Sequence, residues 1–265
     1  METLTLKEPD VRNLLRGKKA LVTGIANDHS IAWGCAKAFR LLGADVAVTY
    51  MNDKARPHVL PLAEQVEAPL VLPLDLRAEG QLEAVFAAIQ KTWGRVDIVL
   101  HSIAFAPKAD LQGRVVDCSR EGFLLAMDLS CWSFIRMAKL AEPLMTNGGC
   151  LFTMSYYGSQ MVVKNYNIMG PVKAALESAV RYLAAELGPA GIRVHAISPG
   201  PLKTRAASGI PEFDALLHKA QAEAPARSLV SIDDVGRAVA FLSLDGARLI
   251  TGETLYIDGG YHIID

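Results

Sequence analysis

The sequence has few cysteines, and none of them stand in a pattern that binds a metal or builds a disulfide framework. Its 265 residues contain four, with no CxxC pair and no paired spacing: Cys35, Cys118, Cys131 and Cys150. Zinc sites and disulfide-rich domains both depend on regular cysteine spacing. We therefore expect buried, reduced thiols and no bound metal.

Long apolar runs and an excess of one charge are also lacking. No stretch of about 18 consecutive apolar residues occurs, and the N-terminus has no basic region followed by an apolar one, so neither a membrane span nor a signal peptide is indicated. The formal net charge is −1, without a run of like charges, which disfavours nucleic acid or an anionic membrane as a partner. These absences favour a soluble cytoplasmic protein that acts on small molecules.

The composition suffices for one substantial core. With 265 residues, 51% of them hydrophobic and 21% charged, the chain is long enough for one large globular domain. No internal repeat or low-complexity linker interrupts it. We interpret residues 1–265 as a single domain with an N-terminal extension at residues 1–15.

Short β-rich runs alternate with longer helical patterns, which is typical of βαβ units. The predicted strands are Ala20–Thr23, Asp45–Tyr50, Leu70–Leu74, Ile98–His101, Cys150–Met154, Val194–Ser198 and Thr254–Ile257. The predicted helices are Ile31–Leu42, Gln81–Trp93, Glu121–Leu144, Asn167–Leu187 and Ile232–Leu242. Most strands are continuously apolar, as expected when helices cover both faces of a parallel sheet. The sequence therefore predicts an α/β fold with a Rossmann-like, doubly wound sheet of about seven strands, which binds ligands at the carboxyl ends of its strands.

The first predicted strand ends in a glycine-opened turn that leads into a helix. Gly24 and Gly34 permit a tight turn and close helix–sheet packing, and the helix N-terminus offers free N–H groups to a pyrophosphate. We expect Ser30 to cap this helix and to reach a phosphate. The turn departs from the simple GxGxxG fingerprint, so an ordinary βα turn stays open as the alternative.

Further strand ends carry residues that suit a nucleotide. Asp75 follows the third strand and could accept a hydrogen bond from an adenine amino group, or be a turn aspartate. Small apolar residues after His101 would let a flat cofactor lie against the backbone, while His101 itself is interpreted as a packed structural residue. The rigid turn at 198–202 could offer backbone groups to a carboxamide, and Asp258–Gly260 is interpreted as a turn.

A tyrosine and a lysine mark the start of an apolar-periodic helix. Tyr166 and Lys173 stand seven positions apart, which is about two helical turns, so both side chains are expected to point into one cleft. A nearby ammonium would lower the pKa of the phenol, and the lysine could hold a sugar hydroxyl of a cofactor. The pair suits acid catalysis beside a nicotinamide.

Two other pairs of tyrosine and lysine fit this chemistry less well. Tyr157 and Lys164 are also seven apart, but Lys164 precedes a plausible helix start, so this pair would straddle a loop. Tyr50 and Lys54 stand at the end of a strand. The pair at the start of the helix is therefore the predicted catalytic one.

Several motifs together resemble one enzyme family. They are Gly24-Ile25-Ala26 with Ser30-Ile31-Ala32, the stretch 101–107, Ser155-Tyr156, Asn165-Tyr166-Asn167 with Met169-Gly170 and Lys173-Ala174, and Pro199-Gly200-Pro201 with 206–210. In this combination the chain is similar to bacterial enoyl-(acyl-carrier-protein) reductases of the FabI type, in the short-chain dehydrogenase/reductase superfamily. The Tyr-x6-Lys spacing and a second tyrosine ten residues upstream separate this family from other short-chain dehydrogenases.

The resemblance implies an activity and a set of site residues. It implies that a homotetramer uses NADH to reduce the 2,3 double bond of trans-2-enoyl thioesters on acyl carrier protein, in fatty acid synthesis. The implied NAD site is lined by Gly24, Ser30, Ile31, Met51, Asp75, Leu76, Ile103, Lys173 and Leu202. The implied catalytic residues are Tyr156, Tyr166 and Lys173. The implied substrate site includes Ala104, Ala106, Tyr156, Tyr166 and Met169.

The segment 203–222 would complete that substrate site. It is interrupted by Gly209 and Pro211, and we interpret it as a mobile lid over an acyl tunnel. Ile210 and Phe213 are its expected lining residues.

The chemistry of the three catalytic residues can be argued from their side chains. Hydride delivered to the β-carbon of an enoyl thioester pushes charge onto the carbonyl oxygen, and the Tyr166 phenol would stabilise that enolate. Lys173 would orient the nicotinamide ribose, while the cofactor carries the hydride. Tyr156 is assigned to substrate positioning, with an aromatic pocket wall as the alternative.

Three residues depart from the family pattern. Ala104 stands where the family usually has glycine, and Met51 follows the second strand where a glutamine or a basic residue is common. Pro171 falls inside the predicted catalytic helix. Because proline lacks the N–H for the bond back to Asn167 and crowds that carbonyl, the helix should start late or kink, which places Tyr166 at or before its first turn.

Alternatives of other classes stay open at this point. One is a short-chain dehydrogenase that reduces a carbonyl in a specialised pathway, and the other is a cofactor-binding protein without catalysis. NADH is expected over NADPH because Asp53 would repel a 2′-phosphate, although Lys54 and Arg56 lie close in sequence and could compensate.

Overall fold

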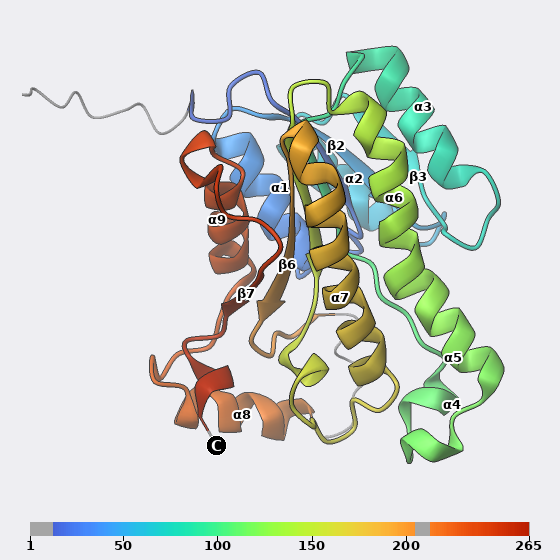
Figure 1. Cartoon of the computed structure of the whole chain (residues 1–265), viewed down its shortest axis with the longest axis vertical. Helices are drawn as coiled ribbons and strands as arrows, with labels where there is room; N and C mark the ends of the chain where they lie inside the picture. The colour runs from blue at the N-terminus through green and yellow to red at the C-terminus, as the bar shows by residue number, and fades with distance from the viewer. Residues whose placement is uncertain (1–12, 205–212, 265) are drawn as a thin grey trace, which may run out of the picture.

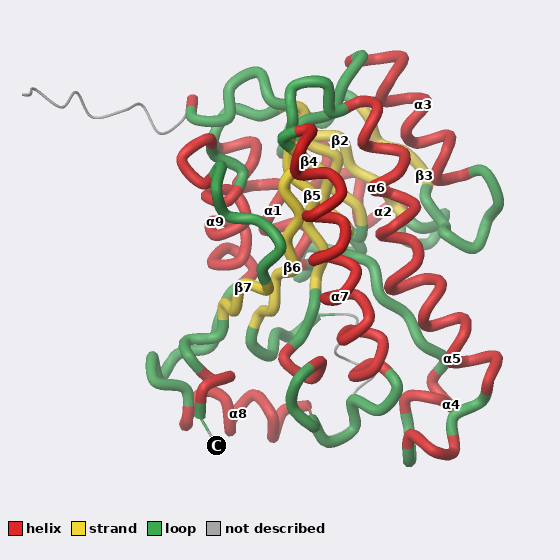
Figure 2. Tube along the Cα trace, viewed as in Figure 1, coloured by secondary structure: helices red, strands yellow, loops and turns green. Residues whose placement is uncertain are grey.

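The computed structural model describes residues 13–204 and 213–264. A seven-stranded parallel sheet, in the order β3-β2-β1-β4-β5-β6-β7, lies between helices (Figures 1 and 2). The strands are β1 (Lys19–Thr23), β2 (Asp45–Tyr50), β3 (Leu70–Pro73), β4 (Ile98–His101), β5 (Gly149–Met154), β6 (Ile192–Pro199) and β7 (Thr254–Ile257). The predicted Rossmann-like, doubly wound sheet is confirmed.

The helices cover both faces of this sheet. One face is covered by α1 (Ile31–Leu41), α2 (Arg56–Gln65) and α9 (Ile232–Leu242). The other is covered by α3 (Gln81–Trp93), α6 (Ser133–Ala141) and α7 (Met169–Leu187). The remaining helices α4 (Lys108–Leu111), α5 (Arg120–Met127) and α8 (Phe213–Glu223) lie toward the end of the molecule at which β6 and β7 point (Figure 1).

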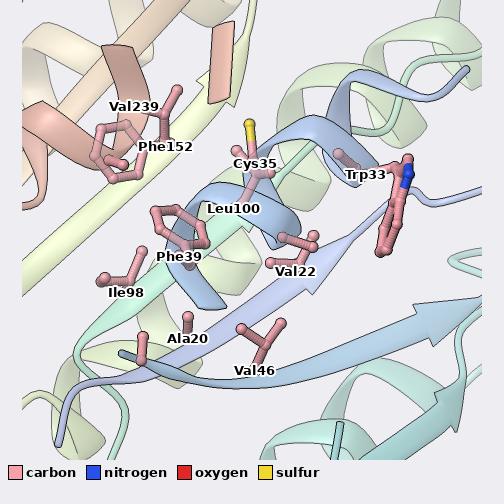
Figure 3. Packing of buried hydrophobic residues seen from close by; sticks show 14 of the residues in the cluster. Ala20, Val22, Trp33, Cys35, Phe39, Val46, Ile98, Leu100, Phe152 and Val239 are labelled. Atoms are coloured by element: carbon pink, nitrogen blue, oxygen red, sulfur yellow. The ribbon is translucent and has the colours of Figure 1, made fainter. Parts of the chain in front are cut away.

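Alternate residues of each central strand enter opposite cores. Ala20 and Val22 of β1 pack with α1 and α9, whereas Leu21 packs with α3, α6 and α7. Figure 3 shows the first of these cores, with Phe39 of α1 close to Ala20 and the rest of the sheet face. Because side chains alternate along a strand and both faces are covered, successive positions in the middle of β1 are apolar.

Glycine lets α1 and α9 approach each other closely. A Cβ atom on Gly34 would lie 2.0 Å from the carbonyl oxygen of Ile232, and one on Gly236 would lie 2.3 Å from that of Gly34. The expectation that Gly34 serves helix–sheet packing was therefore wrong. Its role is in a helix–helix contact that the α1 sequence alone did not reveal.

The predicted helix Glu121–Leu144 is interrupted. A π-helical segment, Asp128–Trp132, separates α5 from α6, and a short 3-10 segment covers Glu142–Leu144. In the π segment, the Ser130 hydroxyl accepts a hydrogen bond from the Phe105 N–H and donates one to the Phe105 carbonyl. The irregularity thus ties this helix to the loop that follows β4.

Smaller expectations were met unevenly. Cys35, Cys131 and Cys150 are buried and free, as expected, whereas Cys118 is free but only half-buried. Leu15, the last residue of the expected N-terminal extension, packs in the core with 1% of its surface exposed. Among the helices that the structure describes, none is both long enough and apolar enough to span a membrane.

Candidate active site

The carboxyl ends of the parallel strands meet at one edge of the sheet. Strands β1 and β4 are neighbours there, yet the chain proceeds from them to opposite sides of the sheet, which makes this the switch point of the fold. Gly24 follows β1 with φ +93°, and a Cβ atom on it would lie 2.0 Å from the carbonyl oxygen of Ser102, after β4. Only glycine fits this crossing, as the sequence suggested.

The turn between β1 and α1 is held by Ser30 in a way that differs from the prediction. Ser30 stands at the N-cap position of α1, but its side chain makes no bond to the helix. Its hydroxyl accepts hydrogen bonds from the N–H groups of Ala26 and Asn27, at 3.0 and 3.1 Å. The serine therefore shapes the turn and does not cap α1 with its side chain. The first N–H groups of α1 stay open to an anion.

Asp75 follows β3 at the same edge and already has a cationic partner. Its carboxylate accepts two hydrogen bonds from the Arg77 guanidinium, at 2.9 and 2.6 Å, and the Arg77 backbone N–H donates a third at 3.0 Å. The bond from Arg77 lowers the pKa of Asp75, so the group is ionised at neutral pH. An adenine amino group would share this carboxylate with Arg77.

The other residues assigned to a cofactor are apolar and mostly half-buried. Ile31, at the start of α1, and Leu202, after β6, pack against the core on the α1 face. Leu76 and Ile103 pack against the core on the opposite face. Met51, after β2, is 46% exposed. Each follows or faces the carboxyl end of a strand, so all of these residues lie along the edge that a dinucleotide would follow.

Lys173 links α7 to the end of β5. Its side chain is only 4% exposed, and its ammonium donates a hydrogen bond of 2.6 Å to the carbonyl oxygen of Met154, the last residue of β5. Burial lowers the pKa of Lys173 to about 8, while the thiol of Cys131 and the carboxylate of Glu177 act against that shift. An ammonium has three donors, so two remain beside the bond to Met154.

A carboxylate that the sequence analysis did not single out lies one helical turn further along α7. Glu177 is 3% exposed, and its Oε1 accepts hydrogen bonds from the hydroxyls of Ser155 and Ser159, at 2.5 and 2.7 Å. A glutamate four residues after Lys173, on the apolar side of the helix, was the available signal, because buried carboxylates are rare unless paired.

Tyr156 and Tyr157 lie on the turn between these two serines, and the Tyr166 ring packs against Tyr156. The rings of Tyr156 and Tyr166 are 5.0 Å apart at an interplanar angle of 64°, and those of Tyr156 and Tyr157 are 4.9 Å apart. Gly158 allows this packing, because a Cβ atom on it would lie 2.6 Å from the Tyr166 ring. The Tyr156 hydroxyl is buried, and no described residue satisfies it in good hydrogen-bonding geometry. Buried hydroxyls normally have a partner, so this group is available to a ligand.

The helical geometry expected for Tyr166 and Lys173 was wrong in one respect. Helix α7 begins at Met169, so Pro171 lies in its first turn, where its missing N–H costs nothing. The late start predicted from Pro171 is confirmed. Tyr166 therefore precedes the helix, between Asn165 and Asn167, which both have positive φ angles of 65° and 45°. A strained loop, and not a shared helix face, orients the phenol.

The expected effect of the lysine on the phenol is also corrected. Burial raises the pKa of Tyr166 well above its ordinary value, and the carboxylate of Glu177 raises it further. The pKa of Tyr156 is raised as well, first by burial and then by the neighbouring tyrosines. Both phenols are therefore protonated at neutral pH and act as hydrogen-bond donors.

An apolar cluster lies next to the tyrosines. Ala106, Met169 and Tyr166 belong to one cluster with Ile168 and Val172, although Ala106 and Met169 are themselves 8% and 6% exposed. Of the other residues assigned to the substrate, Ala104 is exposed and Phe213 is half-buried at the start of α8. Ile210 lies outside the described residues, as does most of the first half of the expected lid.

His101 has the structural role that the sequence suggested. It is fully buried, with its ring nitrogens 2.9 Å from the Thr153 hydroxyl and 2.8 Å from the Ser133 hydroxyl. Burial, together with the nearby Lys173 ammonium, lowers its pKa to about 3. A ring that stays neutral and is bonded at both nitrogens braces β4, β5 and α6 against one another and is not a base.

The donor set at this edge fits a dinucleotide better than a metal. The chain offers a glycine crossing, the open N-terminus of α1, one carboxylate and a buried ammonium, which suit a pyrophosphate and sugars. Among the described residues, no group of three or more histidine, cysteine, aspartate or glutamate side chains is placed to hold a metal ion.

The chain is similar to known proteins in family, sequence and structure. A family model described as enoyl-(acyl carrier protein) reductase matches residues 24–262. An enoyl-(acyl-carrier-protein) reductase (NADH) of Rhizobium meliloti is 45% identical over 253 residues, which cover 96% of this chain and 94% of the relative. The corresponding FabI enzyme of Bacillus cereus is 44% identical over 95% of this chain and 99% of its own length.

Solved structures agree with these sequence matches. The enoyl-(acyl-carrier-protein) reductase of Anaplasma phagocytophilum in complex with NAD matches with a TM-score of 0.91 and 46% identity, covering 95% of this chain and 96% of that one. The Bacillus cereus enzyme with NADP+ and indole naphthyridinone matches with a TM-score of 0.93 and 44% identity, covering 96% and 99% of the two chains.

The buried histidine makes stability depend on pH. Its pKa is lowered from 6.5 to about 3 on folding, so the unfolded chain binds the extra proton and stability is lost as pH falls from about 6.5 toward 3. We expect the midpoint of urea unfolding to fall over this range, and the fall to be shallower for His101→Asn.

His29→Asn is the matched control, because the His29 side chain is 73% exposed. It should keep the pH dependence of the wild type. An equal slope in His101→Asn and the wild type would show that His101 does not contribute.

Proposed function

The chain belongs to the enoyl-(acyl carrier protein) reductase family, and we propose that it uses NADH to reduce the 2,3 double bond of trans-2-enoyl thioesters on acyl carrier protein, in fatty acid synthesis. Membership rests on the family model over residues 24–262 and on relatives at 44 to 46% identity over most of both chains. For this chain's own residues, the proposal rests on one observation at the carboxyl end of β5. The Tyr166 ring packs against Tyr156 there, and Lys173 bonds to the last residue of the strand. The reading as a carbonyl reductase is not favoured by these relatives.

For NADH, we assign a role to each part of the sheet edge. The open N-terminus of α1 would bind the pyrophosphate, and Gly24 would let the backbone approach the ligand closely. Asp75 would accept a bond from the adenine amino group, and Lys173 would donate to the nicotinamide ribose through one of its two remaining donors. The apolar residues that complete the assigned site are Ile31, Met51, Leu76, Ile103 and Leu202, with Ser30 shaping the turn. When bound, NADH supplies the hydride.

Tyr166 is assigned to the developing enolate. Its raised pKa keeps the phenol protonated at neutral pH, so it can donate a hydrogen bond to the thioester oxygen as negative charge develops there. Tyr156 has a buried hydroxyl that no described residue satisfies in good hydrogen-bonding geometry, and we assign it to orienting the thioester. Lys173, buried and positively charged below about pH 8, keeps the local potential positive.

For the acyl chain, we propose the apolar cluster beside the tyrosines. Ala106 and Met169 belong to that cluster, and Ala104 is exposed close to it in sequence. We retain residues 203–222 as the lid and Ile210 and Phe213 as its lining. Within the lid, residues 213–222 belong to α8. We also retain the single domain of residues 1–265, and the cytoplasm as its location, because four free cysteines suit a reducing compartment.

We propose a homotetramer as the working assembly. Large apolar side chains remain exposed on the described chain, including Leu124 on α5, Trp132 in the π segment and Phe241 on α9, which are 48%, 51% and 55% exposed. Exposed apolar surface of this kind marks protein interfaces. Light scattering should give a mass of four times the 28.6 kDa of the chain, and Trp132→Glu should lower it. A wild-type mass equal to one chain would contradict the tetramer.

The activity is tested by following NADH absorbance with a 2-enoyl thioester such as crotonyl-CoA, beside a long-chain 2-enoyl and a 3-oxoacyl thioester. We expect NADH to be consumed with the enoyl substrates only, because the tyrosine pair serves an enolate. NADH should also give a higher kcat/KM than NADPH. Preferential turnover of the 3-oxoacyl thioester would overturn the assignment.

Substitution separates the roles of the two catalytic residues. Tyr166→Phe should lower kcat by roughly ten- to a thousandfold with little change in NADH affinity, because it removes a bond formed mainly in the transition state. Lys173→Ala should weaken NADH binding as well. Steady-state kinetics and NADH fluorescence titration measure the two effects.

Matched controls are Tyr182→Phe on the exposed side of α7 and Lys139→Ala on α6, both at exposed positions. They should behave as the wild type. Wild-type kinetics in Tyr166→Phe and Lys173→Ala would mean that the pair is structural.

A further inference from the structure

We propose that Glu177 is a positioning residue for this reduction: its buried carboxylate fixes the turn that carries Tyr156 and supports Tyr166, and it sets the charge balance of Lys173. The inference rests on the proposed function. It concerns a residue that contacts neither the thioester nor NADH in our assignment and acts through the residues that do.

The Glu177 carboxylate is buried. Glu177 is 3% exposed on the face of α7 that packs against the sheet, among residues such as Leu176 and Val180. An ionised carboxylate in such a place is costly unless hydrogen bonds compensate it. The structure supplies two, from Ser155 and Ser159. A neutral side chain such as glutamine or leucine would avoid the cost of burying a charge, so we infer that the carboxylate has a role.

The two serines that bond to Glu177 hold the turn that carries Tyr156. Ser155 and Ser159 lie on either side of Tyr156 in the chain, and the Ser159 N–H donates to the Tyr156 carbonyl at 3.0 Å. Both hydroxyls donate to the same oxygen of Glu177, Oε1. One carboxylate oxygen therefore closes the turn of residues 155–159 from both ends, which limits the directions that the Tyr156 ring can take.

The turn of residues 155–159 also contacts Tyr166. A Cβ atom on Gly158 would lie 2.6 Å from the Tyr166 ring, and one on Gly170 would lie 3.0 Å from the Gly158 carbonyl oxygen. The turn is thus in direct contact with the Tyr166 ring and with the first turn of α7. A shift of the turn would move both phenols, because interiors this closely packed transmit small displacements.

Glu177 also contributes to the electrostatic environment of Lys173. The titratable groups that face it are Cys131 from the π segment, His101 from β4 and Glu177 from its own helix. Burial keeps the pKa of His101 at about 3 and raises that of Cys131, so both are neutral near pH 7. Cys131 would favour the ammonium only as a thiolate, which burial disfavours, whereas the Glu177 carboxylate also favours it. Burial raises the pKa of the Tyr166 and Tyr256 phenols, and Glu177, which both face, raises it further.

The experiment separates the two parts of the role. Glu177→Gln keeps the size of the side chain and an oxygen that can accept both serine hydroxyls, but removes the charge. The double variant Ser155→Ala with Ser159→Ala removes the hydrogen bonds and keeps the charge. Glu186→Gln is the matched control, because it makes the same chemical change at an exposed position of α7. Thermal unfolding of every variant accompanies the kinetics.

Each variant has its own expected result. In Glu177→Gln, the alkaline limb of kcat/KM for NADH, and of NADH affinity measured by fluorescence, should move to lower pH, because Lys173 loses a favourable charge. In the double serine variant this limb should stay, while kcat for crotonyl-CoA falls by about ten- to a hundredfold and KM for NADH stays within about threefold, as a small misplacement of reacting groups predicts. Glu186→Gln should match the wild type in all of these.

Two outcomes would overturn the proposal. One is an unchanged alkaline limb in folded Glu177→Gln, and the other is a kcat within about twofold of the wild type in the folded double serine variant. If either set fails to fold, the other still decides its part. A wild-type protein that binds NADH but does not reduce the enoyl thioester would instead refute the proposed function, and the pH dependence of NADH binding would still test the coupling of Glu177 to Lys173.

Discussion

Three hydrogen bonds from the buried face of α7 to the exit of β5 hold the candidate site together. Lys173 bonds to the Met154 carbonyl, and Glu177 accepts from Ser155 and Ser159. Beyond the end of a strand the backbone is no longer held by ladder hydrogen bonds, so the path of the chain after β5 depends on such contacts. Because the turn that follows carries one tyrosine and packs against the other, the placement of both phenols depends on a lysine and a glutamate one helical turn apart.

The fold could be predicted from the sequence because its signals are local and repeated. Continuous apolar runs marked the strands to within two residues at each end, and β6 differs most, starting at Ile192 instead of Val194. Helix α2 escaped prediction because prolines, including Pro61 inside the helix, disturb its local pattern. Other features that escaped prediction depend on distant contacts. The π segment Asp128–Trp132 is stabilised by Ser130 bonding to Phe105, and the role of Gly34 depends on Ile232 of a helix near the other end of the chain.

The candidate site was predictable in its residue types but not in its geometry. The sequence identified Tyr156, Tyr166 and Lys173, whereas the helical spacing used to join the last two was incorrect, since α7 begins at Met169. The effect expected of the ammonium on the phenol was reversed by burial, a quantity that no spacing reveals. Glu177 was overlooked because a glutamate in a helix normally faces water, and only the tertiary structure shows that it does not.

The most direct test of this account is a crystal structure of the chain with NADH bound. The account predicts that the Lys173 ammonium keeps its bond to the Met154 carbonyl while a second N–H lies at about 3 Å from a hydroxyl of the nicotinamide ribose. It also predicts that Glu177 still accepts from both serines, with the nicotinamide beside Tyr166. A dinucleotide bound away from the carboxyl ends of β1 and β4, or a Lys173 side chain that contacts no part of it, would contradict the account.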